Sequence, residues 1–86
     1  MEGGPPKPIR EEHLTIGQTV ILTVDPRGEI QAQVFRGATY VGNFKDDEIP
    51  NNFELAKRFL KEEAQSEGLV AVQSKELPGR FQIEGH

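Results

Sequence analysis

The feature that most limits the fold of this chain is a pair of alternating segments joined by a four-residue turn. Residues 19–24 and 29–35 each alternate apolar with polar or β-branched side chains, the pattern of a half-buried β-strand. Between them, Asp25-Pro26-Arg27-Gly28 places proline at the first central position of a turn and offers a glycine for a positive φ. The two strands therefore form a hairpin, whose core face comprises Val20, Leu22, Val24, Ile30, Ala32 and Val34.

A second turn extends this hairpin. Arg36-Gly37-Ala38 separates the second strand from residues 39–44, which alternate again and place Tyr40, Gly42 and Phe44 on one face. Gly42 weakens this strand and indicates a bulge or a close backbone approach. The first three strands are thus expected to form an antiparallel meander.

The next segment has helical periodicity. Residues 52–66 carry an apolar stripe at helical spacing, with an asparagine suited to the N-cap and Gly68 suited to a left-handed stop. Residues 69–73 form a short apolar strand, and residues 80–83 form a fifth strand, which we expect at an edge of the sheet.

These elements predict an α+β fold in which a three-stranded antiparallel meander is followed by one helix and a returning strand. Packing one helix against one face of the sheet is the economical arrangement. We expect a single small domain over residues 16–84, preceded by a disordered or loosely docked tail over residues 1–15. The tail reads as a solvated segment, and the alternative is a recognition peptide in which Pro5-Pro6-Lys7-Pro8 forms a polyproline II helix.

Composition excludes several classes of function. The 86 residues contain no cysteine, so disulfides and thiolate metal sites are ruled out. The two histidines, His13 and His86, lie far apart in the sequence, and we expect no metal site and no cofactor. No apolar run reaches the roughly 18 residues of a membrane span, and the first residues do not form a signal peptide, so the expected location is the cytoplasm.

The residues that carry catalysis are also scarce. Ser66 and Ser74 are the only serines, and neither lies in a nucleophile-elbow motif. The glycines mark turns and form no phosphate-binding loop. A core this small leaves little room for a closed pocket, so we expect the protein not to be an enzyme.

Two surfaces are candidates for binding. The outward face of the sheet carries amides and aromatics between two arginines, side chains that can read or stack on bases: Arg27, Gln31, Gln33, Phe35, Arg36 and Tyr40. The alternative interpretation is that these side chains are polar only because one face of the sheet is in contact with water. The helix region carries an acidic cluster comprising Asp46, Asp47, Glu48, Glu54 and Glu62.

Two resemblances follow from this layout. The meander and helix over residues 19–65, with Gly37 in the second turn, resemble the amino-terminal arm-binding domains of phage integrases, whose basic sheet binds DNA. Here Arg27, Arg36 and Lys45 are the residues that match that sheet in kind. In size, charge and architecture the chain also resembles small acidic phage proteins that inhibit host nucleases.

The leading hypothesis is therefore a non-enzymatic binding or regulatory module that acts through a protein partner or through a second copy of itself. A small acidic inhibitor of the phage or mobile-element type is one form of this hypothesis. The alternative is a nucleic-acid-binding domain that uses the exposed sheet face, although the formal net charge of −4 disfavours it. No membrane partner is expected.

Overall fold

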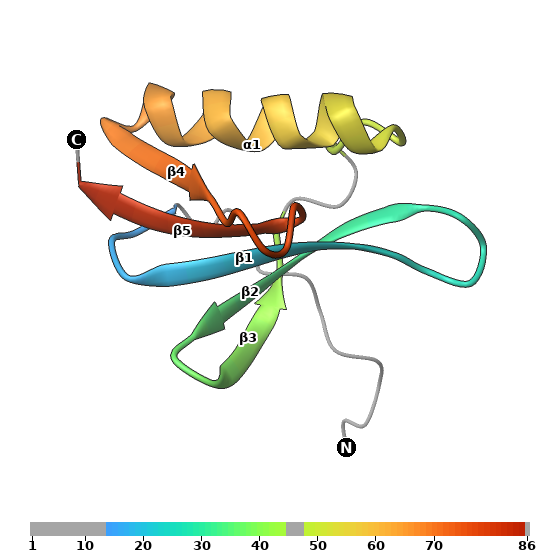
Figure 1. Cartoon of the computed structure of the whole chain (residues 1–86), viewed down its shortest axis with the longest axis horizontal. Helices are drawn as coiled ribbons and strands as arrows, with labels where there is room; N and C mark the ends of the chain where they lie inside the picture. Colours follow the sequence, from blue (N-terminus) through green and yellow to red (C-terminus); the bar gives the residue numbers. More distant parts are fainter. Residues whose placement is uncertain (1–13, 45–47, 86) are drawn as a thin grey trace, which may run out of the picture.

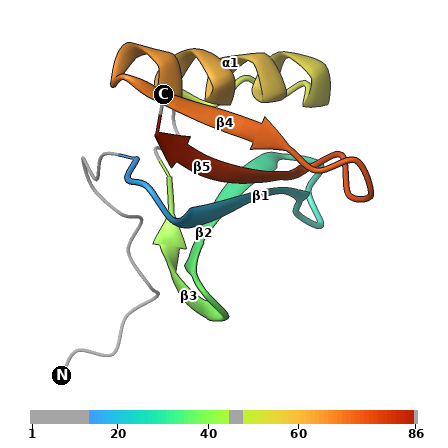
Figure 2. The ribbon, with the colours of Figure 1, turned by 60° about the vertical axis from the view of Figure 1, so that its left-hand side comes forward.

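The described residues form one antiparallel sheet with one helix packed on one of its faces. The computed structural model describes residues 14–44 and 48–85, and Figures 1 and 2 show it from two sides. The elements in chain order are β1 (Gln18–Val24), β2 (Ile30–Arg36), β3 (Thr39–Asn43), α1 (Phe53–Ser66), β4 (Leu69–Gln73) and β5 (Arg80–Gly85). The predicted α+β fold and its order, strand-strand-strand-helix-strand with a fifth strand, are confirmed.

The position of the fifth strand differs from the expectation. Within the described residues the sheet order is β3-β2-β1-β5-β4, and β5 pairs antiparallel with β1 on one side and β4 on the other. β5 therefore lies inside the sheet, and β4 lies at its edge (Figure 1). The short apolar pattern of β5 does not predict this inner position, because the residues of one strand do not show whether it pairs with one strand or with two.

The core lies between the helix and the sheet. Phe81 and Ile83 of β5 are fully buried, as are Val20 of β1 and Leu60 of α1. Further buried residues of the same cluster are Leu14, Leu22, Ala32, Val34, Phe44, Ala56, Ala64 and Ala71. Leu14 belongs to this cluster, although the sequence-based boundary places residues 1–15 in the tail.

The β1–β2 hairpin matches its predicted register. Val20 pairs with Val34 and Leu22 with Ala32, so the predicted core-facing residues share one face. The Asp25 side chain accepts hydrogen bonds from the backbone N–H groups of Arg27 and Glu29, and Gly28 has a φ of 87°. Val24 is an exception to the predicted core, because it is 58% exposed at the end of the strand.

A bulge divides the third strand. The register between β2 and β3 shifts between Val34 and Phe35, so that Phe35 pairs with Tyr40 while Val34 pairs with Gly42. The bulge predicted from Gly42 is therefore present, but the prediction that Tyr40 and Phe44 share a face is wrong. Phe44 is buried in the core, and Tyr40 is exposed beside Phe35. An inserted residue reverses the alternation of every side chain that follows it.

The helix begins and ends where the sequence indicates. The Asn52 side chain accepts a hydrogen bond from the backbone N–H of Leu55 and caps the first turn. Gly68, with a φ of 77°, follows the last turn and leads directly into β4. Ala56, Leu60 and Ala64 form the buried stripe, and small alanines at two of these positions allow close packing on the sheet.

The central position of β5 predicts a large difference between two aliphatic substitutions. Ile83→Ala is expected to lower the free energy of unfolding by about 2–5 kcal/mol, because it removes a fully buried side chain and leaves a cavity. Val24→Ala, on the face that the sequence assigns to the core, is expected to cost about 0.5 kcal/mol or less because it is exposed. Urea unfolding of both variants measures this, and equal losses would contradict the assigned positions.

Candidate functional site

One face of the sheet is left open by the helix. We call it the open face, and its residues in the described chain are Thr19, Ile21, Thr23, Gln31, Gln33, Phe35, Tyr40, Asn43, Val70, Val72, Arg80, Gln82 and Glu84. The predicted candidates Gln31, Gln33, Phe35 and Tyr40 do lie together on this face. The Phe35 and Tyr40 rings meet edge to face with centroids 5.5 Å apart, and the Tyr40 hydroxyl donates to the Asn43 side chain.

The two arginines predicted at this face do not join the group. Arg36 has the strand parity of Val34, so its side chain leaves β2 on the face opposite to Phe35, and its guanidinium donates to Thr15 Oγ1 at 2.9 Å. Arg27 lies in the turn at the other end of β2 and forms an exposed ion pair with Glu29, 3.9 Å apart. The seven-residue strand separates the two arginines by about 20 Å. They therefore cannot act on one small ligand together.

The predicted acidic cluster is only partly described. Asp46 and Asp47 lie outside the described residues, and Glu48 is exposed just after that gap. Glu54 forms an ion pair with Lys57 at 3.1 Å, and Glu62 is exposed on the second half of α1. Glu54 therefore stands next to cations, and it lines a hollow with Lys57, Arg58 and Lys61.

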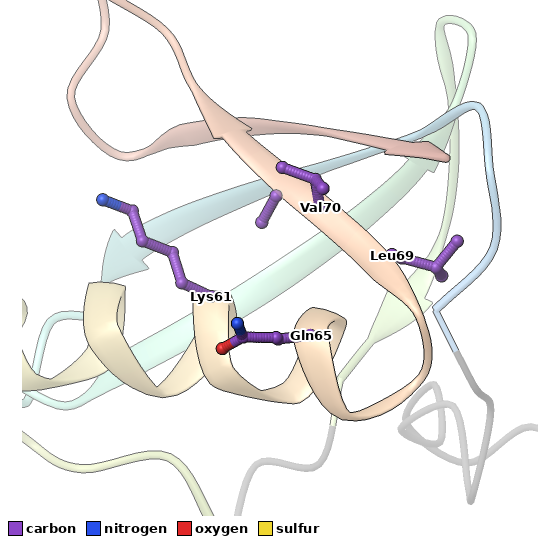
Figure 3. A pocket seen from close by; sticks show the side chains of 5 residues that line it. Lys61, Gln65, Leu69 and Val70 are labelled. Carbon is purple, nitrogen blue, oxygen red and sulfur yellow. The ribbon is translucent and has the colours of Figure 1, made fainter. Parts of the chain in front are cut away.

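That hollow is part of a groove that the sequence did not suggest. We call it the β4–α1 groove. It consists of two adjoining hollows of about 290 and 300 Å³ that share Lys61. Figure 3 shows the first, with Lys61 and Gln65 on the helix and Leu69 and Val70 on the strand. The complete lining is Glu54, Lys57, Arg58, Lys61, Gln65, Leu69, Val70, Ala71 and Gln73.

The groove widens along the strand. β4 begins beside the C-terminal end of α1 and runs away from the helix toward Gln73 (Figures 1 and 3). The first hollow lies at the narrow end near Leu69, and the second lies at the wide end beside Gln73 and Arg58. Both volumes are at the lower limit for small-molecule sites, and both hollows open to the surface.

The free edge of β4 faces this groove. The backbone N–H of Ser74 donates to Arg80 C=O, and β4 pairs with β5 in a regular antiparallel register. Ladder hydrogen bonds alternate along an antiparallel strand, so Val72 and Val70 direct their N–H and C=O groups to β5. Leu69, Ala71 and Gln73 direct theirs outward, away from the sheet. Ala71 is buried and lines the first hollow, so its outward groups border the groove.

The helix side of the groove is basic. Lys57, Lys61 and Gln65 are spaced four residues apart and form one row along α1, with Arg58 beside it. Lys57 is held by Glu54 and lies over the Phe53 ring, with Nζ 5.3 Å from the centroid, whereas no ion pair among the described residues involves Arg58 or Lys61. Three cations against one carboxylate leave a local positive excess on a chain of net charge −4.

A sequence signal for this row existed. Lys57 and Lys61 lie on one flank of the helix beside its buried stripe, and Arg58 follows on the solvent side of that flank. These cations indicate a binding groove only if β4 is an edge strand beside that flank. The edge position of β4 results from the insertion of β5 between β1 and β4, and the helix pattern does not contain it.

The described residues contain no other concentration of reactive groups. Among residues 14–44 and 48–85, no three histidine or carboxylate side chains are placed to hold a metal ion. No buried side-chain nitrogen or oxygen in the same ranges lacks a hydrogen-bond partner. None of the helices in the described part of the chain is long and apolar enough to cross a membrane.

Comparisons with protein-family models, with curated proteins and with solved structures found no match to this chain.

The geometry predicts that the groove cations differ in what they do for the fold. Lys57→Ala is expected to lower the free energy of unfolding by about 1 kcal/mol, since its side chain is only 16% exposed and packs over Phe53. Lys61→Ala is expected to change it by about 0.5 kcal/mol or less. Thermal or urea unfolding of both variants decides this, and a larger loss for Lys61→Ala would show that Lys61 holds the fold.

Proposed function

We propose that this protein is a non-enzymatic binding module that acts on a protein partner through the β4–α1 groove. The observation that carries the proposal is the free, uncharged edge of β4 beside a row of cations on α1. We also propose that it works in the cytoplasm, which suits a cysteine-free chain. A regulatory role, in which the module occupies a site on its partner, fits its small size.

The two edges of the sheet support this choice. Proteins protect edge strands with bulges, charges or short length, because unpaired N–H and C=O groups invite pairing. β3, at one edge, contains the bulge and Gly42. β4, at the other edge, is regular, reads Leu-Val-Ala-Val-Gln, and leaves Val70 37% and Val72 43% exposed. An edge strand with neither a bulge nor a charged side chain is suited to pairing with another chain.

The chemistry of the groove also favours recognition. Its side chains are three cations, the carboxylate of Glu54, amides and aliphatic groups, which supply charge pairing, hydrogen bonds and apolar contact. The free cations Arg58 and Lys61 lie where a second molecule can approach them. Their charge would steer an acidic partner toward this side of an otherwise acidic protein.

A nucleic-acid-binding sheet remains the second candidate, and one observation favours it. The Phe35–Tyr40 ring pair lies on the open face close to the amides of Gln33 and Asn43, a combination that can stack on bases. The charge of that face argues against it, because its described ionisable side chains are one arginine, one glutamate and the tyrosine. Backbone binding of DNA or RNA depends on several cations.

The two candidates predict different contact surfaces, which site-specific photo-crosslinking in cells can separate. A photoreactive phenylalanine analogue replaces Gln65 in the groove, Gln33 on the open face or Glu62 on the helix. We expect a discrete adduct from position 65 that survives nuclease treatment, with weaker adducts from positions 33 and 62. Gln65 and Glu62 are exposed, and Gln33 is half-buried at the surface of its strand.

Each outcome has a defined meaning. Nuclease-sensitive adducts from position 33 would replace the proposal with the nucleic-acid candidate. Absence of protein adducts at all three positions would contradict a protein-binding module. An adduct of twice the chain's mass would identify the partner as a second copy.

A further inference from the structure

We propose that the β4–α1 groove binds an extended acidic segment of the partner, which adds to the sheet as a sixth strand alongside β4. This inference rests on the proposed function and specifies the kind of ligand and how it is held. Its parts are the outward backbone groups of β4, the exposed valines on one side of that strand, and the free cations on the other.

The backbone of β4 supplies the first contact. Leu69, Ala71 and Gln73 point their N–H and C=O groups away from β5, as the ladder alternation requires. No backbone hydrogen bond joins Ala71 to a described residue outside the strand ladder. The outward N–H and C=O groups of an edge strand are open to pairing, and a strand laid in the groove would pair with them.

The side chains on the two sides of β4 specify the ligand's pattern. Successive residues of an added strand point to opposite faces of the sheet. Those on the open face would meet Val70 and Val72, which favour apolar or β-branched neighbours across the strands. Those on the helix face would meet Lys61 and, further along the groove, Arg58, which favour carboxylates. The ligand therefore alternates apolar and acidic residues.

The charge of the groove also disfavours a second copy of this chain as its occupant. In a symmetric antiparallel pairing of two copies through β4, both helices would lie on the same face of the joined sheet, with their groove flanks toward each other. Lys61 and Arg58 of one copy would then approach the same residues of the other, and like charges facing each other are unfavourable. An acidic segment from a different protein meets no such repulsion.

The test uses the complete chain and a synthetic peptide, acetyl-Thr-Val-Glu-Val-Glu-Val-Thr-amide, labelled with a fluorophore. We expect saturable binding by fluorescence polarisation that weakens at least tenfold when salt rises from about 50 to 500 mM, because the charge contacts are exposed. Two peptide controls isolate the contributions. Replacing both glutamates by lysine, or methylating alternate backbone nitrogens so that they cannot donate, should each weaken binding at least tenfold.

Two protein variants test whether the peptide binds in the groove. Reversing both free cations, Arg58→Glu with Lys61→Glu, is expected to weaken binding at least tenfold. Arg27→Glu with Arg80→Glu, an equal change of net charge outside the groove, is expected to alter it less than twofold. Amide exchange followed by NMR tests the backbone contact, because the peptide should slow the Ala71 amide at least tenfold, while those of Val70 and Val72 are already protected by β5.

The outcomes separate this inference from the proposed function. No binding of the acidic peptide, equal binding of the lysine peptide, or binding that tolerates the methylated backbone would overturn strand addition. A stable dimer with slow Ala71 exchange before peptide is added would assign the edge to a second copy and also overturn it. If the peptide fails while photo-crosslinking still finds a protein partner, the binding module stands and only the ligand pattern is wrong.

Discussion

The structure depends on the hydrogen bonds that β5 makes on both of its sides. β5 joins the β1–β2–β3 meander to the strand that leaves the helix, because it pairs with β1 and with β4. Its two inward side chains, Phe81 and Ile83, are fully buried and lie in the same core cluster as Val20 and Leu60. Without β5, no strand pairing would connect β4, and the helix that precedes it, to the meander.

The same pairing creates the candidate site. By occupying the space next to β1, β5 displaces β4 to the edge, although β4 comes earlier in the chain. β4 then leaves the end of α1 and diverges from it, so the groove between them is a direct result of the helix-to-strand connection at Gly68. The cations of the helix flank border this groove because the buried alanines and Leu60 fix the rotation of the helix.

The folded protein separates positive and negative side chains within a segment that is acidic in total. The segment around the helix is acidic in total, yet the flank of α1 toward β4 carries Lys57, Arg58 and Lys61. A sum over a stretch of sequence mixes all sides of a helix, whereas a partner meets one side. The acidic character expected of the helix region therefore does not describe the groove, and the groove is where the cations can act.

The sequence by itself determined the elements, their order and most of the core. Alternation, turn residues and caps are local, because each depends on the backbone preferences of a few neighbouring residues. For that reason Gly28, Gly42, Asn52 and Gly68 indicated a turn, a bulge and the two helix ends. The tertiary structure decided what those elements face. It placed Tyr40 and Phe44 on opposite faces of the sheet, turned Arg36 away from the open face, and made β4 an edge strand. Register shifts, strand neighbours and helix rotation depend on contacts between residues far apart in the chain, and no local pattern contains them.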